Sequence, residues 1–173
     1  MNILSRLGLI KVFVFDMDGV LTDGGLLIQQ QGEWLRRMDI KDGYALQLAV
    51  KQGYKVVIVS GSESKPVADR LNKLGISEVF MNIKDKEFFL KNYMETNNCQ
   101  PGEVLFMGDD IPDYGCMRLV GFACCPSDAA PEIRRIASYI SSKTGGCGCV
   151  RDVIEKALKL NNKWPLHTSV AAT

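Results

Sequence analysis

The sequence has little histidine, little net charge and no long hydrophobic run. Its one histidine, His167, lies near the C-terminus, and the formal net charge is +1 over 173 residues. A charge so close to zero gives neither a basic surface for nucleic acid nor an acidic tail, so any anionic ligand must be bound by local groups. No apolar stretch is long enough to cross a bilayer, and the N-terminal segment lacks a small-residue cleavage pattern. We therefore expect no nucleic-acid partner, no membrane partner and no signal peptide.

The six cysteines are not needed as a disulfide framework. With 46% hydrophobic and 24% charged residues, the chain can form one domain with a complete core. We therefore predict reduced thiols and a cytoplasmic protein. Cys147 and Cys149 would suit zinc only beside a second pair of cysteine or histidine ligands, and the sequence places none at a suitable spacing.

Short β-branched runs alternate with helical patterns along most of the chain, which is typical of a parallel sheet with flanking helices. We expect strands at residues 10–15, 55–59, 78–81, 104–107 and 122–124, and helices around residues 46–53, 67–75, 85–97, 111–119 and 150–158. The predicted fold class is α/β, with a Rossmann-like parallel sheet in a single domain of residues 1–160. Residues 161–173 are polar and small, and we expect a disordered tail there.

Residues 24–38 interrupt this alternation. Their mixture of apolar and polar residues predicts two strands around a turn near Gln31 and Gly32, which is a β-hairpin protruding from the sheet. A hairpin of this size cannot bury all four of its large apolar side chains, which are Leu27, Trp34, Leu35 and Met38. Either another subunit covers some of them, or the hairpin folds back onto its own domain.

Two acidic clusters follow directly on apolar, β-rich runs. Asp16 and Asp18 follow IKVFVF, while Asp109 and Asp110 follow EVLFM. Ligands of an open α/β sheet bind beyond the carboxyl ends of its strands, so both clusters should share one crevice with Ser60, which follows KVVIV. Two aspartates capping a turn would explain the first cluster alone, but not the second. The oxygen-rich set suits Mg²⁺, whereas the residues after D-x-D-G lack the ligands of a calcium-binding EF-hand loop.

These residue types suit phosphoryl transfer. An aspartate held against Mg²⁺ can attack phosphorus, because the metal neutralises the repulsion between carboxylate and phosphoryl oxygens. A second carboxyl two residues on can protonate the leaving alkoxide and then activate water. Ser60 can donate hydrogen bonds to the transferring group, and one lysine, Lys84 or Lys86, can balance its charge. Alone, either lysine also fits a solvated helix start.

The chain resembles the haloacid dehalogenase superfamily of phosphohydrolases in four segments. They are FDMDGVLTDG, VSG, the pair Asp85 and Lys86, and GDDIPD, in the order of the superfamily's motifs. The resemblance implies that Asp16 is the nucleophile and that Asp18 is the general acid and base. It also implies that Ser60 and Lys86 bind the phosphoryl group.

The same resemblance implies a Mg²⁺ site. Its ligands would be Asp16, the backbone carbonyl of Asp18, and Asp109. Asp110 and Asp113 would support these ligands without binding the metal directly.

The intervals between the first three motifs are too short for the cap domain that most of the superfamily carries. A capless site is open to water, so it must act on a large substrate or be closed by a neighbouring subunit. A missing cap combined with a hairpin is similar to the tetrameric phosphatases that act on 3-deoxy-D-manno-octulosonate 8-phosphate, a lipopolysaccharide precursor. This similarity implies a Mg²⁺-dependent phosphomonoesterase that forms a homotetramer with shared active sites.

This similarity also implies substrate contacts outside the motifs. The contacts outside the motifs are Asp39, Ile40, Lys41, Asp42 and Gly43 in DIKDG, together with Ser62 and Arg70. Within the motifs, the similarity implies that Asp18 and Lys86 also contact the substrate. A plain helix N-cap at Asp42 would also explain DIKDG. In relatives the glycine-rich stretch at 145–149 reaches toward an active site, but a flexible linker would also explain it.

Two departures from the commoner pattern leave the sugar open. At Ser62 and Cys147 many relatives carry arginine. The alternative substrate is a nine-carbon keto-deoxy sugar acid 9-phosphate. A second alternative is a non-catalytic assembly module of the same fold.

Overall fold

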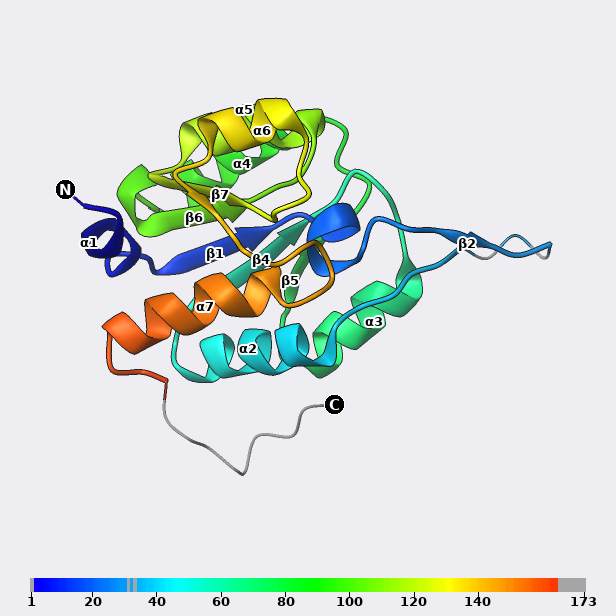
Figure 1. Ribbon diagram of the computed structural model, residues 1–173, viewed down its shortest axis with the longest axis horizontal. Helices are drawn as coiled ribbons and strands as arrows, with labels where there is room; N and C mark the ends of the chain where they lie inside the picture. The colour runs from blue at the N-terminus through cyan, green and yellow to red at the C-terminus, as the bar shows by residue number, and fades with distance from the viewer. Residues whose placement is uncertain (1, 31, 33, 165–173) are drawn as a thin grey trace.

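The computed structural model describes residues 2–30, 32 and 34–164. Within these residues, six strands form a parallel sheet in the order β5-β4-β1-β6-β7-β8 (Figure 1). The strands are β1 (Val12–Phe15), β4 (Lys55–Val59), β5 (Glu78–Phe80), β6 (Val104–Met107), β7 (Phe122–Cys125) and β8 (Tyr139–Ile140). The α/β class and the five predicted strands are confirmed. The two-residue β8 was not predicted, because so short a strand carries no periodicity.

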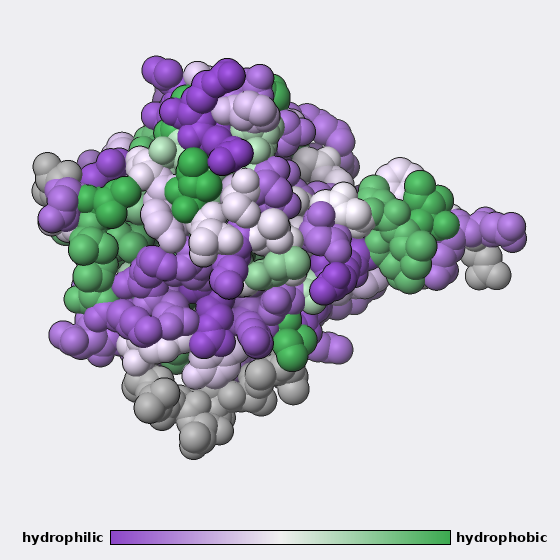
Figure 2. Space-filling model, viewed as in Figure 1, coloured by the Kyte–Doolittle hydropathy of each residue, from purple (hydrophilic) through white to green (hydrophobic). Residues whose placement is uncertain are grey.

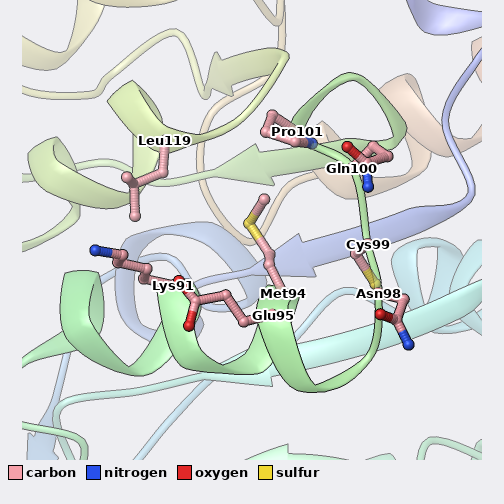
Figure 3. Close-up of a pocket in the computed structure, with 8 residues that line it drawn as sticks. All are labelled: Lys91, Met94, Glu95, Asn98, Cys99, Gln100, Pro101 and Leu119. Atoms are coloured by element: carbon pink, nitrogen blue, oxygen red, sulfur yellow. The ribbon is translucent and has the colours of Figure 1, made fainter.

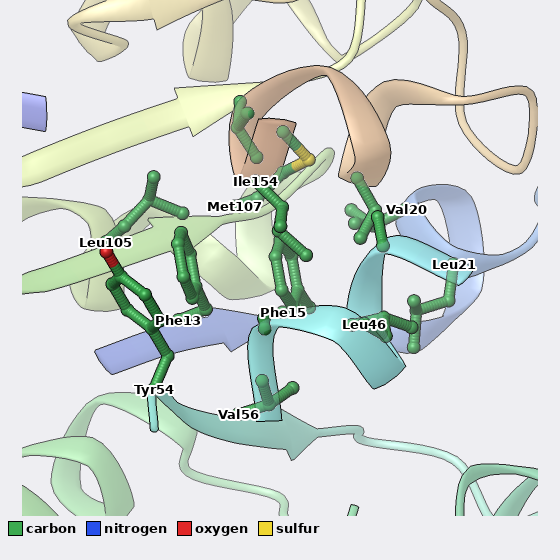
Figure 4. Close-up of a cluster of buried hydrophobic side chains, with 14 of the residues drawn as sticks. Phe13, Phe15, Val20, Leu21, Leu46, Tyr54, Val56, Leu105, Met107 and Ile154 are labelled. Atoms are coloured by element: carbon green, nitrogen blue, oxygen red, sulfur yellow. The ribbon is translucent and has the colours of Figure 1, made fainter. Parts of the chain in front are cut away.

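Helices cover both faces of the sheet. One face packs against α1 (Ile3–Leu7), α2 (Ile40–Lys51), α3 (Lys65–Lys73) and α7 (Cys149–Leu160), and the other against α4 (Lys86–Thr96), α5 (Tyr114–Leu119) and α6 (Pro131–Ile136). Figure 1 shows the two layers above and below the strands. Because side chains alternate along a strand, Phe13 and Phe15 face the α2 and α7 layer, while Val12 and Val14 face the α4 layer. Figure 4 shows the two phenylalanines in this cluster, with Phe13 next to Tyr54.

Some helix predictions need correction. The helix expected at 111–119 is a short 3₁₀ turn, η3 (Ile111–Asp113), followed by α5. Pro112 lacks a backbone N–H, and the Asp110 side chain accepts a 2.8 Å hydrogen bond from the first backbone N–H of the turn. Helices α1 and α6 and the 3₁₀ turn η2 (Pro101–Glu103) were not predicted. None of the described helices is both long and apolar enough to cross a membrane.

Residues 24–38, called the arm below, project from the body of the molecule (Figure 1). Strand β2 (Leu27–Ile28) pairs antiparallel with β3 (Trp34–Leu35). The expected turn residue Gln31 lies outside the described residues. Ile28 is 69% exposed and Trp34 is 55% exposed, so these strands do not fold back onto their own domain, and that interpretation is wrong for them. Figure 2 shows the apolar patch that the arm carries; its exposed apolar residues are Leu26, Leu27, Ile28, Trp34 and Leu35.

The base of the arm packs on the body of the molecule, and the C-terminal segment is packed further than expected. Met38 packs against the core and pairs with Thr22 across an antiparallel bridge. The Asn161 side chain donates a 3.2 Å hydrogen bond to the carbonyl of Gly8, and the Trp164 ring packs against the core. Residues 161–164 therefore belong to the packed body, while the rest of the expected tail, 165–173, lies outside the described residues. All six cysteines are described, and each is a free thiol.

Candidate active site

Three central strands bring polar residues to the same edge of the sheet. Asp16 directly follows β1, Ser60 follows β4 and Asp109 lies just past β6, and β1 pairs with both of the other strands. The order of the strands reverses here, which is the usual ligand position in such sheets. These ends line an open cleft of about 330 Å³. Its lining residues are Asp16, Asp18, Gly19, Gly24, Ser60, Gly61, Ser62, Lys86, Asp109, Asp110, Pro112 and Asp113.

Lys86 lies at the centre of this acidic cleft. Its Nζ donates hydrogen bonds to Asp16 Oδ1 at 2.7 Å and to Asp113 Oδ1 at 2.8 Å, and its side chain is only 6% exposed. Burial alone would lower the pKa of Lys86, but the carboxylates of Asp113 and Asp16 outweigh it and raise this pKa. The other candidate, Lys84, is exposed and donates to the Gly61 carbonyl. The structure thus brings Lys86, and not Lys84, to the predicted nucleophile.

The carboxylates around Lys86 form a group that could hold a metal ion. One oxygen each of Asp16, Asp109 and Asp113 lie within 4.8 Å of one another. Burial, followed by repulsion from Asp113, raises the pKa of Asp16, and the same two causes raise the pKa of Asp109 to about 7. A divalent cation would relieve this repulsion, and the oxygen donors fit Mg²⁺.

Asp113 and Asp110 have partners that suit the supporting role expected of them. Asp113 Oδ1 accepts from Lys86, and its Oδ2 accepts a 3.1 Å hydrogen bond from the backbone N–H of Asp109. Both oxygens of Asp113 are therefore engaged within the chain. Asp110 is exposed at the rim of the cleft and caps η3.

Glycines allow the loop after β1 to pack tightly. Gly19 has φ +86°, and a Cβ built there would lie 2.0 Å from Asp109 Oδ2, so only glycine fits. Behind this loop, a Cβ on Gly145 would lie 2.0 Å from the Gly19 carbonyl oxygen, and the N–H of Gly146 donates to the carbonyl of Val20. The stretch at 145–149 is therefore packed against the loop after β1 of its own chain, and the flexible-linker interpretation is wrong. Cys147 within it is exposed.

The sequence analysis missed one charged residue at the cleft, Arg36 from the base of the arm. Its Nε donates to Asp18 Oδ1 at 2.7 Å and its Nη2 donates to Asp18 Oδ2 at 3.3 Å. The same Nη2 reaches Ser62 Oγ at 3.3 Å, and Ser62 Oγ donates to Asp18 Oδ2 at 2.6 Å. Ser60 Oγ lies 3.2 Å from Ser62 Oγ. No sequence signal marked Arg36, because the pattern of the arm only indicated strands.

The DIKDG segment lies outside the acidic cleft of its own chain. Asp39 is the N-cap of α2, and its side chain accepts from the backbone N–H groups of Lys41 and Asp42. The alternative N-cap at Asp42 was therefore placed three residues too late. Asp39 and Lys41 instead line a groove of about 750 Å³ along α7 that also includes Cys147. Ile40 is 58% exposed.

Asp42 connects two helices. It is 2% exposed, and its carboxylate accepts hydrogen bonds from the backbone N–H groups of Arg151 at 2.7 Å and Gly148 at 3.2 Å. Burial raises the pKa of Asp42 to about 6, although these hydrogen bonds oppose the shift. Both oxygens hold the start of α7 against α2, so this structure does not offer Asp42 to a ligand.

Arg70 lies in the contact between α3 and α2. A Cβ on Gly43 would lie 3.0 Å from Arg70 Nη2, so the glycine makes room for the guanidinium. Arg70 Nη2 is buried without a hydrogen-bond partner. Neither Arg70 nor Gly43 lines the acidic cleft. Of the expected substrate contacts outside the four motifs, only Ser62 lies there.

A further hollow, of about 440 Å³, lies between the end of α4 and the turn η2 that leads into β6 (Figure 3). Since η2 precedes β6, this hollow lies near the amino ends of the strands, away from the acidic cleft. The only charged side chains that line it are Lys91 and Glu95. Burial raises the pKa of the Cys99 thiol in its wall, which makes the thiol less reactive. The acidic cleft therefore remains the candidate active site.

Comparison with known proteins assigns the family. No protein-family model matches the chain. The 3-deoxy-D-manno-octulosonate 8-phosphate phosphatase KdsC of Yersinia pestis is 32% identical over 162 residues, which cover 94% of this chain and 87% of KdsC. KdsC from Escherichia coli K12 is 30% identical, with 94% of this chain and 86% of that protein covered.

Solved structures agree with the sequence comparison. The Yersinia pestis crystal structure has a TM-score of 0.90 and covers 93% of this chain and 87% of its own. The phosphatase from Moraxella catarrhalis, solved with a magnesium ion, a phosphate ion and a KDO molecule, has a TM-score of 0.89 at 32% identity and covers 92% of each chain. With its acidic cleft at the carboxyl edge of a six-stranded sheet, the chain belongs to the KdsC family of haloacid dehalogenase-type phosphatases.

Proposed function

We propose that the protein is a Mg²⁺-dependent phosphomonoesterase that hydrolyses 3-deoxy-D-manno-octulosonate 8-phosphate to the free sugar acid and phosphate. The observation that carries the proposal is the buried Lys86, which holds Asp16 beside Asp109 at the carboxyl edge of the sheet. The KdsC relatives supply the substrate, and the complex from Moraxella catarrhalis supports Mg²⁺ as the cofactor. The product would be a lipopolysaccharide precursor, and the six free thiols fit a reducing cytoplasm.

Asp16 is the proposed nucleophile. Lys86 donates to one of its carboxylate oxygens, Oδ1, so the Asp16 carboxylate is held in a fixed orientation. Attack by this carboxylate on phosphorus forms an aspartyl phosphate, and the ammonium of Lys86 together with the hydroxyl of Ser60 balances charge on the phosphoryl oxygens. Mg²⁺, bound by Asp16, Asp109 and the Asp18 carbonyl, supplies the charge neutralisation that lets two anions approach.

Asp18 is the proposed general acid and base. It lies two residues after the nucleophile at the rim of the cleft, and its carboxyl oxygens are held by Arg36 and Ser62. A protonated Asp18 gives its proton to the leaving alkoxide of the sugar. The resulting carboxylate then takes a proton from the water that hydrolyses the aspartyl phosphate, which returns Asp16 to its initial state.

Phosphate release from a panel of substrates tests the proposal. With Mg²⁺, the wild-type protein should release phosphate from the eight-carbon sugar acid phosphate with a higher kcat/KM than from its nine-carbon homologue or from hexose phosphates. Asp16→Asn should abolish turnover while the protein still folds and binds Mg²⁺. Equal kcat/KM for hexose phosphates would refute the substrate, and full activity of Asp16→Asn would refute covalent catalysis. Absence of turnover on the whole panel would favour the non-catalytic assembly module.

We also propose a homotetramer in which neighbouring subunits cover the arm. The exposed side chains of Leu27, Ile28 and Trp34 form an apolar patch on a projecting segment, which is typical of an interface (Figure 2). In that assembly, Ile40 and Lys41 would contact the substrate of a neighbouring subunit, because they lie outside the cleft of their own chain.

Sedimentation velocity tests this assembly. The wild-type protein should sediment as a tetramer, and Trp34→Glu should sediment as a smaller species. Phe88→Glu is the matched control, since Phe88 is 64% exposed on α4, away from the arm. A monomeric wild type, or equal dissociation in both variants, would contradict the proposal.

A further inference from the structure

The arm brings one buried charge to the edge of the acidic cleft. The side chain of Arg36 is 4% exposed, whereas that of its neighbour Arg37 is 77% exposed. Arg36 directly follows β3, whose Trp34 is 55% exposed. Arginine is rarely this buried unless its charge has a partner. The buried guanidinium of Arg36, at the base of an otherwise exposed segment, therefore indicates a specific role for this residue.

The contacts of Arg36 place it beside Asp18, not beside the nucleophile. Within the described part of the chain, its side chain hydrogen bonds to Asp18, to Ser62 and to the Trp34 carbonyl at 3.4 Å. The proposed phosphoryl contacts around Asp16 are made by Lys86 instead. Arg36 thus lies beside Asp18 and Ser62 at the rim of the cleft, and it also lines a neighbouring hollow of about 240 Å³ with Glu63, Ser64 and Pro66.

We infer that Arg36 is a substrate-binding residue that selects substrates carrying a carboxylate in addition to the phosphate. This inference rests on the proposed function, which places the bridging oxygen at Asp18. A guanidinium has five N–H groups in a planar fork that matches the geometry of carboxylates. Four of these N–H groups donate to Asp18, Ser62 and the Trp34 carbonyl, and the remaining N–H on Nη1 can donate to a carboxylate of the bound sugar acid. A neutral sugar phosphate offers no such partner.

The first test compares two substrates in three variants. In Arg36→Gln, the KM for the eight-carbon sugar acid phosphate should rise roughly 10- to 100-fold more than the KM for glucose 6-phosphate, as expected for lost charge-assisted hydrogen bonds to the carboxylate. Arg36→Lys keeps the charge but loses the planar fork, so its KM for the sugar acid phosphate should lie between those of the wild type and Arg36→Gln. Arg37→Gln is the matched control and should behave as wild type. Equal changes for both substrates in Arg36→Gln would overturn the inference, because Arg36 would then act only on Asp18 or on the phosphate.

The second test does not depend on turnover and so separates this inference from the proposed function. Calorimetry measures binding of the free eight-carbon sugar acid, and of its analogue with an alcohol in place of the carboxylate, to wild-type protein and to Arg36→Gln. The sugar acid should bind wild type at least about tenfold more tightly than the variant, and the alcohol should bind both equally. Equal binding of the sugar acid to both proteins would overturn the role of Arg36. A wild type without turnover that still binds the sugar acid through Arg36 would refute only the proposed reaction.

Discussion

Replacing Lys86 by methionine should destabilise the metal-free protein strongly and in a pH-dependent way. Lys86 is the common partner of the buried carboxylates of Asp16 and Asp113, at 2.7 and 2.8 Å. Removing one partner of a buried ion pair costs about 3–5 kcal/mol of the free energy of unfolding. For a chain of this size, that loss corresponds to a melting temperature lower by roughly 6–20 °C.

The sign of the pH dependence follows from the pKa shifts. The pKa of Lys86 is raised, so its stabilising charge is present throughout pH 5–8 in the wild type. In Lys86→Met, Asp16 has lost the ammonium that opposes the effect of burial on its pKa. Asp16 then takes up a proton more readily as the pH falls, which relieves the unpaired charge. The loss of stability should therefore be larger at pH 8 than at pH 5.

Urea denaturation in EDTA at both pH values measures this effect. Lys84→Met is the matched control, because Lys84 is exposed two residues away and should change the free energy of unfolding little at either pH. Equal losses in Lys86→Met at pH 5 and pH 8 would refute the electrostatic reasoning. An equal loss in the two variants would refute the central role of Lys86.

Three further predictions concern the metal site and the packing around it. The pKa of Asp109 near 7 predicts that Mg²⁺ affinity, measured by calorimetry, falls about tenfold per pH unit below pH 7, because protons compete with the metal; a constant Kd would contradict this. Gly19→Ala should lower the melting temperature and weaken Mg²⁺ binding, whereas Gly32→Ala, with a similar φ of +84° but no neighbour within 4 Å, should leave Mg²⁺ binding unchanged. Asp42→Ala leaves two backbone N–H groups at the start of α7 without acceptors, so urea denaturation should show a loss of about 2–4 kcal/mol, and no loss would refute its role in docking α7.

The sequence predicted those site residues that follow long apolar strands. Asp16, Ser60 and Asp109 each come after a buried run, and parallel strands necessarily bring their carboxyl ends together. Residue type alone left both Lys84 and Lys86 open, because both lie near the start of the same helix, and only the family resemblance favoured Lys86. In the structure, the difference depends on the direction of each side chain once Asp85 caps α4 by accepting from a backbone N–H in its first turn.

Residues held by long-range packing could not be predicted. Arg36 and Arg37 are identical in type and adjacent, yet only the fold of the arm buries the first. DIKDG was recognised as a motif, but its distance from the cleft depends on how α2 docks against α7. Asp42 and Gly148 are separated by most of the chain, and no local pattern indicates that one would hold the other.

The arm combines two properties on one short segment: an exposed apolar surface on its strands and the buried guanidinium of Arg36 at its base. Among its described residues, Gly24 lines the acidic cleft and Arg36 contacts it through Asp18 and Ser62. An exchange of residues 24–38 between relatives would therefore replace the exposed apolar surface and the neighbour of Asp18 in one step, while Asp16, Lys86 and Asp109 stay untouched. Such a segment can diverge as a unit, so that a surface and one wall of the cleft change together while the acidic residues at the strand ends stay the same.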